Sequence, residues 1–182
     1  MHYVTASEIE RRLPWVLDSP SDKGTVELIV VRPHTDQRES CTQAMFSPSD
    51  GVLGDNWKTQ CWKTLPSGQA HPDVQVAIMN ARMIDVLSRD RAQWALAGDQ
   101  LFVDFDLSVV NLTPGDRLRV GAVTLEITVE PHRGCQKFRQ RFGDAALDCV
   151  NSSQGDNHRL RGIYAKIISA GEVRVGDVIG KC

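Results

Sequence analysis

The sequence lacks the features that mark several large classes of protein. No apolar run approaches the roughly 18 residues of a membrane-spanning helix, and the polar start MHYVTASEIERRL does not match a secretory signal peptide. The formal net charge of −2 gives no reason to expect nucleic acid as a partner. We therefore expect a cytoplasmic protein that binds neither membranes nor nucleic acids.

The cysteines also lack the spacings that mark disulfide frameworks and structural zinc. Their number is odd, and no Cys-x-x-Cys pair occurs. In a reducing compartment such cysteines are free thiols. The five are Cys41, Cys61, Cys135, Cys149 and Cys182. The chain contains no flavin, nicotinamide or iron–sulfur signature either, and we do not expect pyridoxal phosphate.

What the sequence does contain is a series of short β-type segments separated by turn residues. The chain of 182 residues, 41% hydrophobic, is long enough for one domain with a sizeable core. Strands are predicted over residues 25–33, 74–80, 100–112, 117–131 and 161–179. Residues 117–131 contain a turn at Gly121-Ala122, and residues 161–179 are two strands around Ala170-Gly171. Many short strands with few helices favour a closed β-barrel with inserted helices, a mainly β (α+β) fold.

Two longer helices interrupt this pattern. The first is expected from Thr5 to Leu13, because Thr5 and Glu8 fit a capping box and Pro14 should end the helix. The second should begin after Asn80 as its N-cap and continue to Gly98, a residue typical of helix C-termini.

Positive charge gathers around one cysteine. From Pro131 to Lys166 there are seven basic and three acidic residues, a balance of +4. QKFRQRFG after Cys135 reads as a short helix, so Cys135 should lie near a helix N-terminus, where backbone N–H groups and guanidinium charges favour the thiolate. A thiolate is both a nucleophile and a ligand for soft metals. The alternatives are an inert buried cysteine and a solvated basic face.

His132 precedes Cys135 by three residues. A His–Cys acid–base pair is conceivable, and a pocket wall or substrate contact is the alternative. The two residues alone are too few ligands for zinc.

Two segments carry a family resemblance. GDRLRVGAVTLEITVEPHRGCQKFRQRFG and RLRGIYAKIISAGEVRVGDVI closely resemble the MOSC domain, named for the C-terminal domain of molybdenum cofactor sulfurase. VELIVVRP and GVLGDNW upstream resemble stand-alone bacterial-type members. The resemblance implies a MOSC-type β-barrel domain at residues 24–182, preceded by a helix-and-linker extension at residues 1–23.

The resemblance also implies a role for Cys135 as the molybdenum ligand of the molybdopterin cofactor, as in the amidoxime-reducing members, which reduce N-hydroxylated substrates. An anion pocket for the cofactor is expected from basic residues, whose guanidinium groups suit phosphate. Asn111 and Asp55, each in a loop after a strand, are weaker candidates, since such residues are commonly turn formers. The expected cofactor-binding set is Arg133, Lys137, Arg139, Arg141, Arg161, Asn111 and Asp55, with Cys135 and His132 as catalytic candidates.

The sequence leaves three functions open. The first is a molybdenum-dependent oxidoreductase acting on a small molecule with electrons from a separate reductase. The second is a molybdenum-independent transferase for glutathione or another anionic thiol, or a sulfur-transfer enzyme, using the same basic pocket. The third is a non-catalytic carrier of the cofactor. A homodimer is compatible with each.

Overall fold

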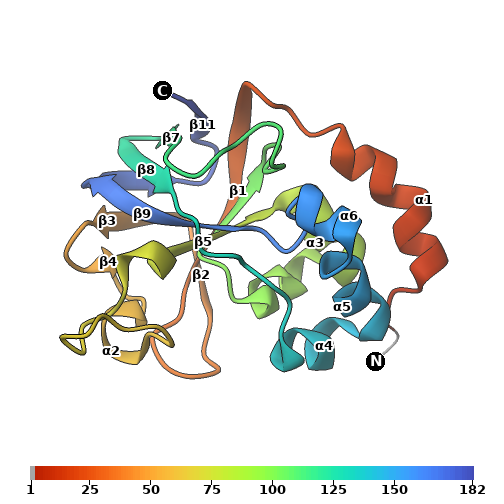
Figure 1. Cartoon of the computed structure of the whole chain (residues 1–182), viewed down its shortest axis with the longest axis horizontal. Helices are drawn as coiled ribbons and strands as arrows, with labels where there is room; N and C mark the ends of the chain where they lie inside the picture. Colours follow the sequence, from red (N-terminus) through yellow and green to blue (C-terminus); the bar gives the residue numbers. More distant parts are fainter. Residues whose placement is uncertain (1–2) are drawn as a thin grey trace.

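The computed structural model describes residues 3–182, and a closed β-barrel forms its centre (Figure 1). Seven of the eight strands of the main sheet close in the order β1–β11–β7–β8–β9–β5–β6 and back to β1. Only the pairing of β5 with β6 is parallel among these. The barrel strands are β1 (Lys23–Val31), β5 (Val76–Asn80), β6 (Leu101–Asp104), β7 (Arg117–Val120), β8 (Val123–Ile127), β9 (Ile163–Ser169) and β11 (Val178–Lys181). The predicted fold class is confirmed.

A short strand and a second sheet extend the barrel. β2 (Glu39–Cys41) pairs with the end of β1 that is not used by β11. The second sheet has the order β10–β3–β4 and turns Phe46 and Val173 into the main core. Its strands are β3 (Gln43–Ser47), β4 (Gly51–Val52) and β10 (Gly171–Arg174).

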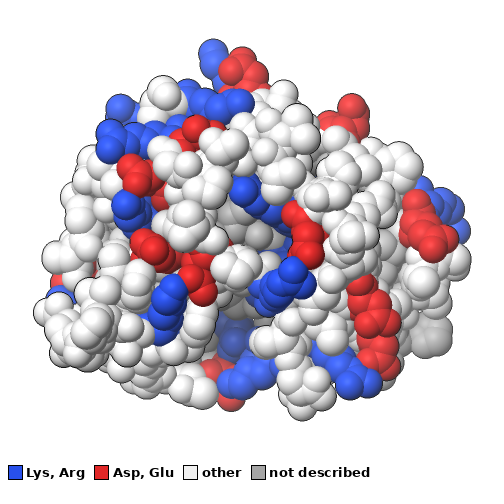
Figure 2. All heavy atoms as spheres, viewed as in Figure 1, with Lys and Arg blue, Asp and Glu red and all other residues white. Residues whose placement is uncertain are grey.

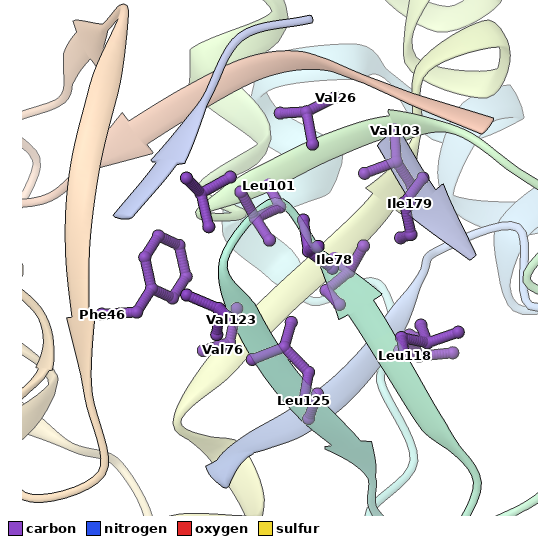
Figure 3. Close-up of a cluster of buried hydrophobic side chains, with 14 of the residues drawn as sticks. Val26, Phe46, Val76, Ile78, Leu101, Val103, Leu118, Val123, Leu125 and Ile179 are labelled. Carbon is purple, nitrogen blue, oxygen red and sulfur yellow. The ribbon is translucent and has the colours of Figure 1, made fainter. Parts of the chain in front are cut away.

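Alternating side chains fill the barrel interior. Along β8, residues Val123, Leu125 and Ile127 are buried while the residues between them are half-buried, which is the period of a strand with one face in the core. Figure 3 shows Val123 and Leu125 pointing toward Ile78 and Leu101 from strands on other sides of the barrel. The interior is therefore a packed core.

Helices α1 and α3 to α6 gather on one side of the barrel, with α2 on the other (Figure 1), and a second apolar cluster is buried between these helices and the barrel. α1 packs against α3 and α5, and α4 packs against α5 and η2. Among residues 3–182, no helix combines the length and apolar character that a membrane crossing requires. The helices are α1 (Ala6–Leu17), α2 (Trp57–Gln60), α3 (Ala81–Ser88), α4 (Gln136–Phe142), α5 (Asp144–Val150) and α6 (Ser153–Asn157), with 3-10 helices η1 (Pro72–Val74) and η2 (Arg91–Ala97).

The first helix begins as predicted but does not end at Pro14. The capping box between Thr5 and Glu8 is present, whereas α1 continues to Leu17 with Pro14 inside it. Pro14 is exposed, so water can satisfy the carbonyl that its missing N–H leaves free. Burial of Val16 in the helical cluster favours the extra turn. The extension predicted at residues 1–23 stays a prediction, and residues 1 and 2 lie outside the described part of the chain.

The second helix is also divided differently from the prediction. Asn80 caps α3 through a hydrogen bond from Met83 N at 3.0 Å, and Gly98 ends the segment at φ 87°, as expected. The prediction of a single helix between these two residues is wrong, because Arg89 adopts φ 59° and Asp90 is extended. The Asp90 side chain then caps the separate helix η2.

Two strand predictions are corrected as well. The strand expected over residues 100–112 ends at Asp104, because the Asp106 side chain accepts from Ser108 and folds the chain into a turn. Residues 161–179 form parts of three strands rather than two, since a second turn occurs at Gly176 with φ 92°.

Candidate functional site

Cys135 occupies the N-cap position of α4 with its side chain exposed. Its carbonyl accepts from Arg139 N at 3.0 Å, while its sulfur makes no capping hydrogen bond. The preceding Gly134 is fixed by Asn151, which accepts from Gly134 N at 2.8 Å and donates to its carbonyl at 3.0 Å. A Cβ at Gly134 would lie 2.7 Å from Leu147 Cδ1 and 3.0 Å from Val150 Cγ2, so a larger residue there requires these side chains to shift. The thiol is therefore presented to solvent by a well-supported turn.

Two basic side chains of α4 reach across to the connection between β1 and β2. Lys137 Nζ lies 3.3 Å from Asp36 Oδ1, and Arg141 Nη2 lies 3.1 Å from the same oxygen. Arg141 also donates to the Leu96 carbonyl at 2.8 Å. These contacts bring the helix that starts at Cys135 against the loop that contains Arg38.

Arg38 has an unusual environment. Its Nε is buried and has no hydrogen-bond partner within residues 3–182, and none of the ion pairs in that range includes it. Burial lowers the pKa of Arg38, and the nearby charges of Arg141 and Arg32 lower it further. A guanidinium held close to two others, with an unpaired donor, is well suited to an anionic ligand.

Arg32, at the end of β1, is held by Asp55. The Asp55 side chain has no exposed surface and accepts from Arg32 N, Nε and Nη2 at 2.8–3.0 Å. It also accepts from Trp57 N at 3.0 Å and Gln100 Nε2 at 3.2 Å. The pKa of Arg32 is raised, because the hydrogen bonds and charge of Asp55 outweigh burial. Asp55 therefore orients a cation in this structure rather than facing a pocket itself.

These residues form one group, which we call the Arg38 cluster. Its members are Arg32, Arg38, Lys137, Arg141, Asp36 and Asp55. Four cations face two carboxylates, an excess of two positive charges. Figure 2 shows Lys and Arg residues interleaved with Asp and Glu over the face that Figure 1 presents.

A second ion pair, between Arg161 and Asp99, is buried. Arg161 Nη1 donates to both oxygens of Asp99 at 2.8 and 2.9 Å, and Nη2 donates to the Ala97 carbonyl at 3.0 Å. Its guanidinium carbon lies 4.8 Å from the centre of the Phe138 ring, so α4 rests on this group. Burial raises the pKa of Asp99, and the charge of Arg161 opposes that effect. Arg161 is thus a buried support of α4.

His132 is buried against the same pair. Its side chain is 6% exposed, its Nδ1 lies 3.5 Å from Asp99 Oδ1, and its ring centre lies 4.3 Å from that of Tyr164. Burial, with the charges of Arg161 and Arg32, lowers the pKa of His132 well below 6.5. The imidazole is therefore neutral at physiological pH.

The remaining candidates are placed apart from the Arg38 cluster. Arg133 pairs with Asp156 at 2.7 Å, and Arg139 pairs with Asp144. Asn111 donates to the Asp106 carbonyl at 2.7 Å and closes the turn after β6.

Sequence reasoning missed Arg32, Arg38 and Asp99. Arg32 directly follows a buried strand, and that position was the one available signal for it. Nothing in the local sequence distinguishes Arg38 or Asp99 from ordinary loop residues.

Within residues 3–182, no three His, Cys, Asp or Glu side chains gather as a metal site would require. A metal at Cys135 would therefore take its other ligands from a cofactor or from solvent. The exposed Cys135 sulfur and the unpaired Arg38 Nε fit a cofactor that carries both a thiophilic metal and an anionic group.

Comparisons with known proteins agree with this architecture. The sequence model of the MOSC domain matches residues 68–180. The fold is similar to the YuaD protein from Bacillus subtilis, with a TM-score of 0.64 and 16% identity over 86% of this chain and 94% of that one. YiiM from Escherichia coli gives a TM-score of 0.55 and 17% identity, covering 87% of this chain and 69% of that one. YiiM from Geobacillus stearothermophilus gives a TM-score of 0.56 and 10% identity, covering 87% of this chain and 75% of that one. No curated protein sequence matches.

Proposed function

Because the chain belongs to the MOSC domain family, we propose that it binds the molybdenum cofactor and reduces small N-hydroxylated substrates, with Cys135 as the protein ligand of the metal. One observation supports this most strongly. An exposed cysteine begins a helix whose other side chains join a cluster with two excess positive charges and an unpaired, partly buried guanidinium.

The residues present have distinct parts in this proposal. Arg38 and Arg141 would bind the cofactor phosphate, since guanidinium groups pair with phosphate through two hydrogen bonds at once. Lys137 adds charge at the edge of the cluster. Asp55 fixes the direction of Arg32 through three hydrogen bonds. The Cys135 sulfur would complete the coordination of the metal.

The cofactor, when bound, supplies a centre that exchanges two electrons. Reduction of an N-hydroxyl group to the amine consumes two electrons and two protons and releases water. The electrons would come from a separate reductase that carries a flavin or an iron–sulfur centre. His132, three residues before Cys135, is neutral and packed on Tyr164, so it would add no charge to the segment that leads to Cys135.

The proposal is tested by molybdenum analysis of the protein purified from a host that loads a control molybdenum enzyme. We expect close to one metal per chain, lost in Cys135→Ser and retained in Cys182→Ser, which removes the other exposed thiol. Arg38→Gln should lower occupancy because it removes the unpaired guanidinium. The loaded protein, supplied with a chemical reductant, should convert an N-hydroxylated amidine to the amidine. Metal-free protein from a competent host would refute the proposal.

The same charge excess leaves one alternative with a clear test. Glutathione is an anionic thiol with two carboxylates, which guanidinium groups also recognise. If the protein carries no molybdenum, saturable binding of glutathione that is weakened by Arg38→Gln would favour a thiol transferase.

A further inference from the structure

A cavity of about 280 Å³ is lined in part by the segment that leads from β8 to Cys135. Its walls come from the turn at Pro114, the residues that follow β8, α6 and the start of β9. Figure 1 shows these four parts of the chain converging where β8 and β9 leave the barrel toward the helices. None of the members of the Arg38 cluster lines it.

Arg159 is the notable residue of this cavity. Arg159 follows α6, and its backbone lies in the left-handed region at φ 46°. Its half-buried side chain lines the cavity. Nη1 donates to the carbonyls of Leu112 at 2.9 Å and Leu107 at 3.3 Å. Burial lowers the pKa of Arg159, against the opposing charge of Asp116. Within residues 3–182, Nε and Nη2 make no hydrogen bond and no carboxylate lies within ion-pair distance.

The other charges that line the cavity already have partners. Arg133 pairs with Asp156 at 2.7 Å. Glu130 pairs with Lys63. His132 is neutral for the reasons given above. Arg159 therefore supplies the one lining charge, among the described residues, that is left without a counterion.

The rest of the lining decides which anion fits. Pro114 and Val129 offer exposed apolar surface, which favours a ligand with an apolar body. The free Nε and Nη2 edge of a guanidinium matches the two oxygens of one carboxylate. Two carboxylates, Glu130 and Asp156, also line the cavity and disfavour a dianion such as phosphate by repulsion.

We propose that this cavity binds a small organic monocarboxylate, with the carboxylate paired to Arg159 and the apolar body against Pro114 and Val129. This site goes beyond the proposed molybdenum chemistry. It does not depend on that chemistry, because the cavity and the Arg159 cation are formed by the protein without a cofactor. Its ligand class is defined by one negative charge and an apolar group.

Calorimetric titration of the metal-free Cys135→Ser protein with phenylacetate tests the proposal. A single ion pair with a small apolar group predicts saturable binding with a Kd on the order of 1 mM or tighter. Phenylacetamide, the neutral analogue of the same shape, should bind about tenfold more weakly or not at all. Inorganic phosphate should not compete.

Variants separate the site from general charge effects. Arg159→Gln should abolish binding, whereas Arg174→Gln, which removes an exposed arginine paired with Glu172, should leave it unchanged. Because Arg159 also holds two carbonyls, its loss can weaken the fold. Val129→Trp is the second test, since Val129 is 75% exposed and a larger side chain there closes the cavity without disturbing the core.

Absence of saturable phenylacetate binding overturns the proposal. So does equal binding of phenylacetamide, or binding retained in both Arg159→Gln and Val129→Trp. Competition by phosphate at equal affinity would overturn the assigned ligand class.

Discussion

Replacing Asp55 with alanine should be among the most damaging single changes to stability. The Asp55 carboxylate is fully buried and accepts five hydrogen bonds, three of them from Arg32. Alanine leaves a guanidinium that is only 26% exposed without its counterion, and leaves the backbone N–H groups of Arg32 and Trp57 without acceptors. Breaking a buried pair in this way costs about 3–5 kcal/mol.

Urea denaturation measures that cost. With an m-value of about 2 kcal/mol per molar for a chain of this size, a loss of about 4 kcal/mol lowers the midpoint by about 2 M. The free energy of unfolding of a native domain is only about 5–15 kcal/mol, so the Asp55→Ala protein is expected to be marginally folded at best. The matched control is Asp50→Ala, which removes a similar 2.6 Å contact to Lys58 where both side chains are about half exposed. Its midpoint should move little, because solvent screens exposed pairs.

The double variant Arg32→Met with Asp55→Ala sharpens the test. Removing both charges leaves no buried unpaired cation, so part of the loss should be recovered, with a coupling energy of about 1–3 kcal/mol. Two results would refute the idea that burial determines how much the Arg32–Asp55 pair contributes to stability. One is an equal urea midpoint for Asp55→Ala and Asp50→Ala, and the other is additive losses of unfolding free energy in the double variant.

Three further predictions follow from the same structure. Iodoacetamide should modify exposed Cys135 well before Cys149, whose thiol pKa is raised by burial, and peptide mass spectrometry will show the order. Because the folded pKa of His132 is lowered, the unfolded chain binds more protons below pH 6.5, so stability should fall on acidification by up to about 1.4 kcal/mol per pH unit. Denaturation at pH 7 and 5.5 should show this, and a smaller slope in His132→Phe. Thr5→Ala should cost about 1 kcal/mol through loss of the cap on α1, measured as a lower melting temperature.

Much of the fold was accessible from local sequence patterns. The alternation along β7 and β8 and the turn between them at Gly121 are properties of nearby residues, and the prediction there is confirmed. The capping roles of Thr5 and Asn80 are confirmed for the same reason. The continuation of α1 through Pro14 was not accessible, because it depends on tertiary burial of Val16.

For the candidate site, too, local features could be predicted from the sequence and tertiary contacts could not. The position of Cys135 at a helix start could be predicted, since Gly134 and the helix-forming QKFRQRF are adjacent to it in sequence. The partners of the basic residues could not, because Asp36 is more than 100 residues away from Lys137. Arg38 acquires its character only when α4 packs against its loop. Counting nearby basic residues therefore identified the basic side chains of α4 but not Arg38, the guanidinium of the cluster that has no ion pair.

The most direct test of the central claim is the molybdenum X-ray absorption spectrum of the cofactor-loaded protein beside the same protein with Cys135→Ser. If Cys135 is the ligand, the spectrum of the unmodified chain contains one more sulfur neighbour than that of the variant. Cys182→Ser should match the unmodified chain. Identical sulfur coordination with and without Cys135, at equal metal content, would contradict the assignment of this thiol as the metal ligand.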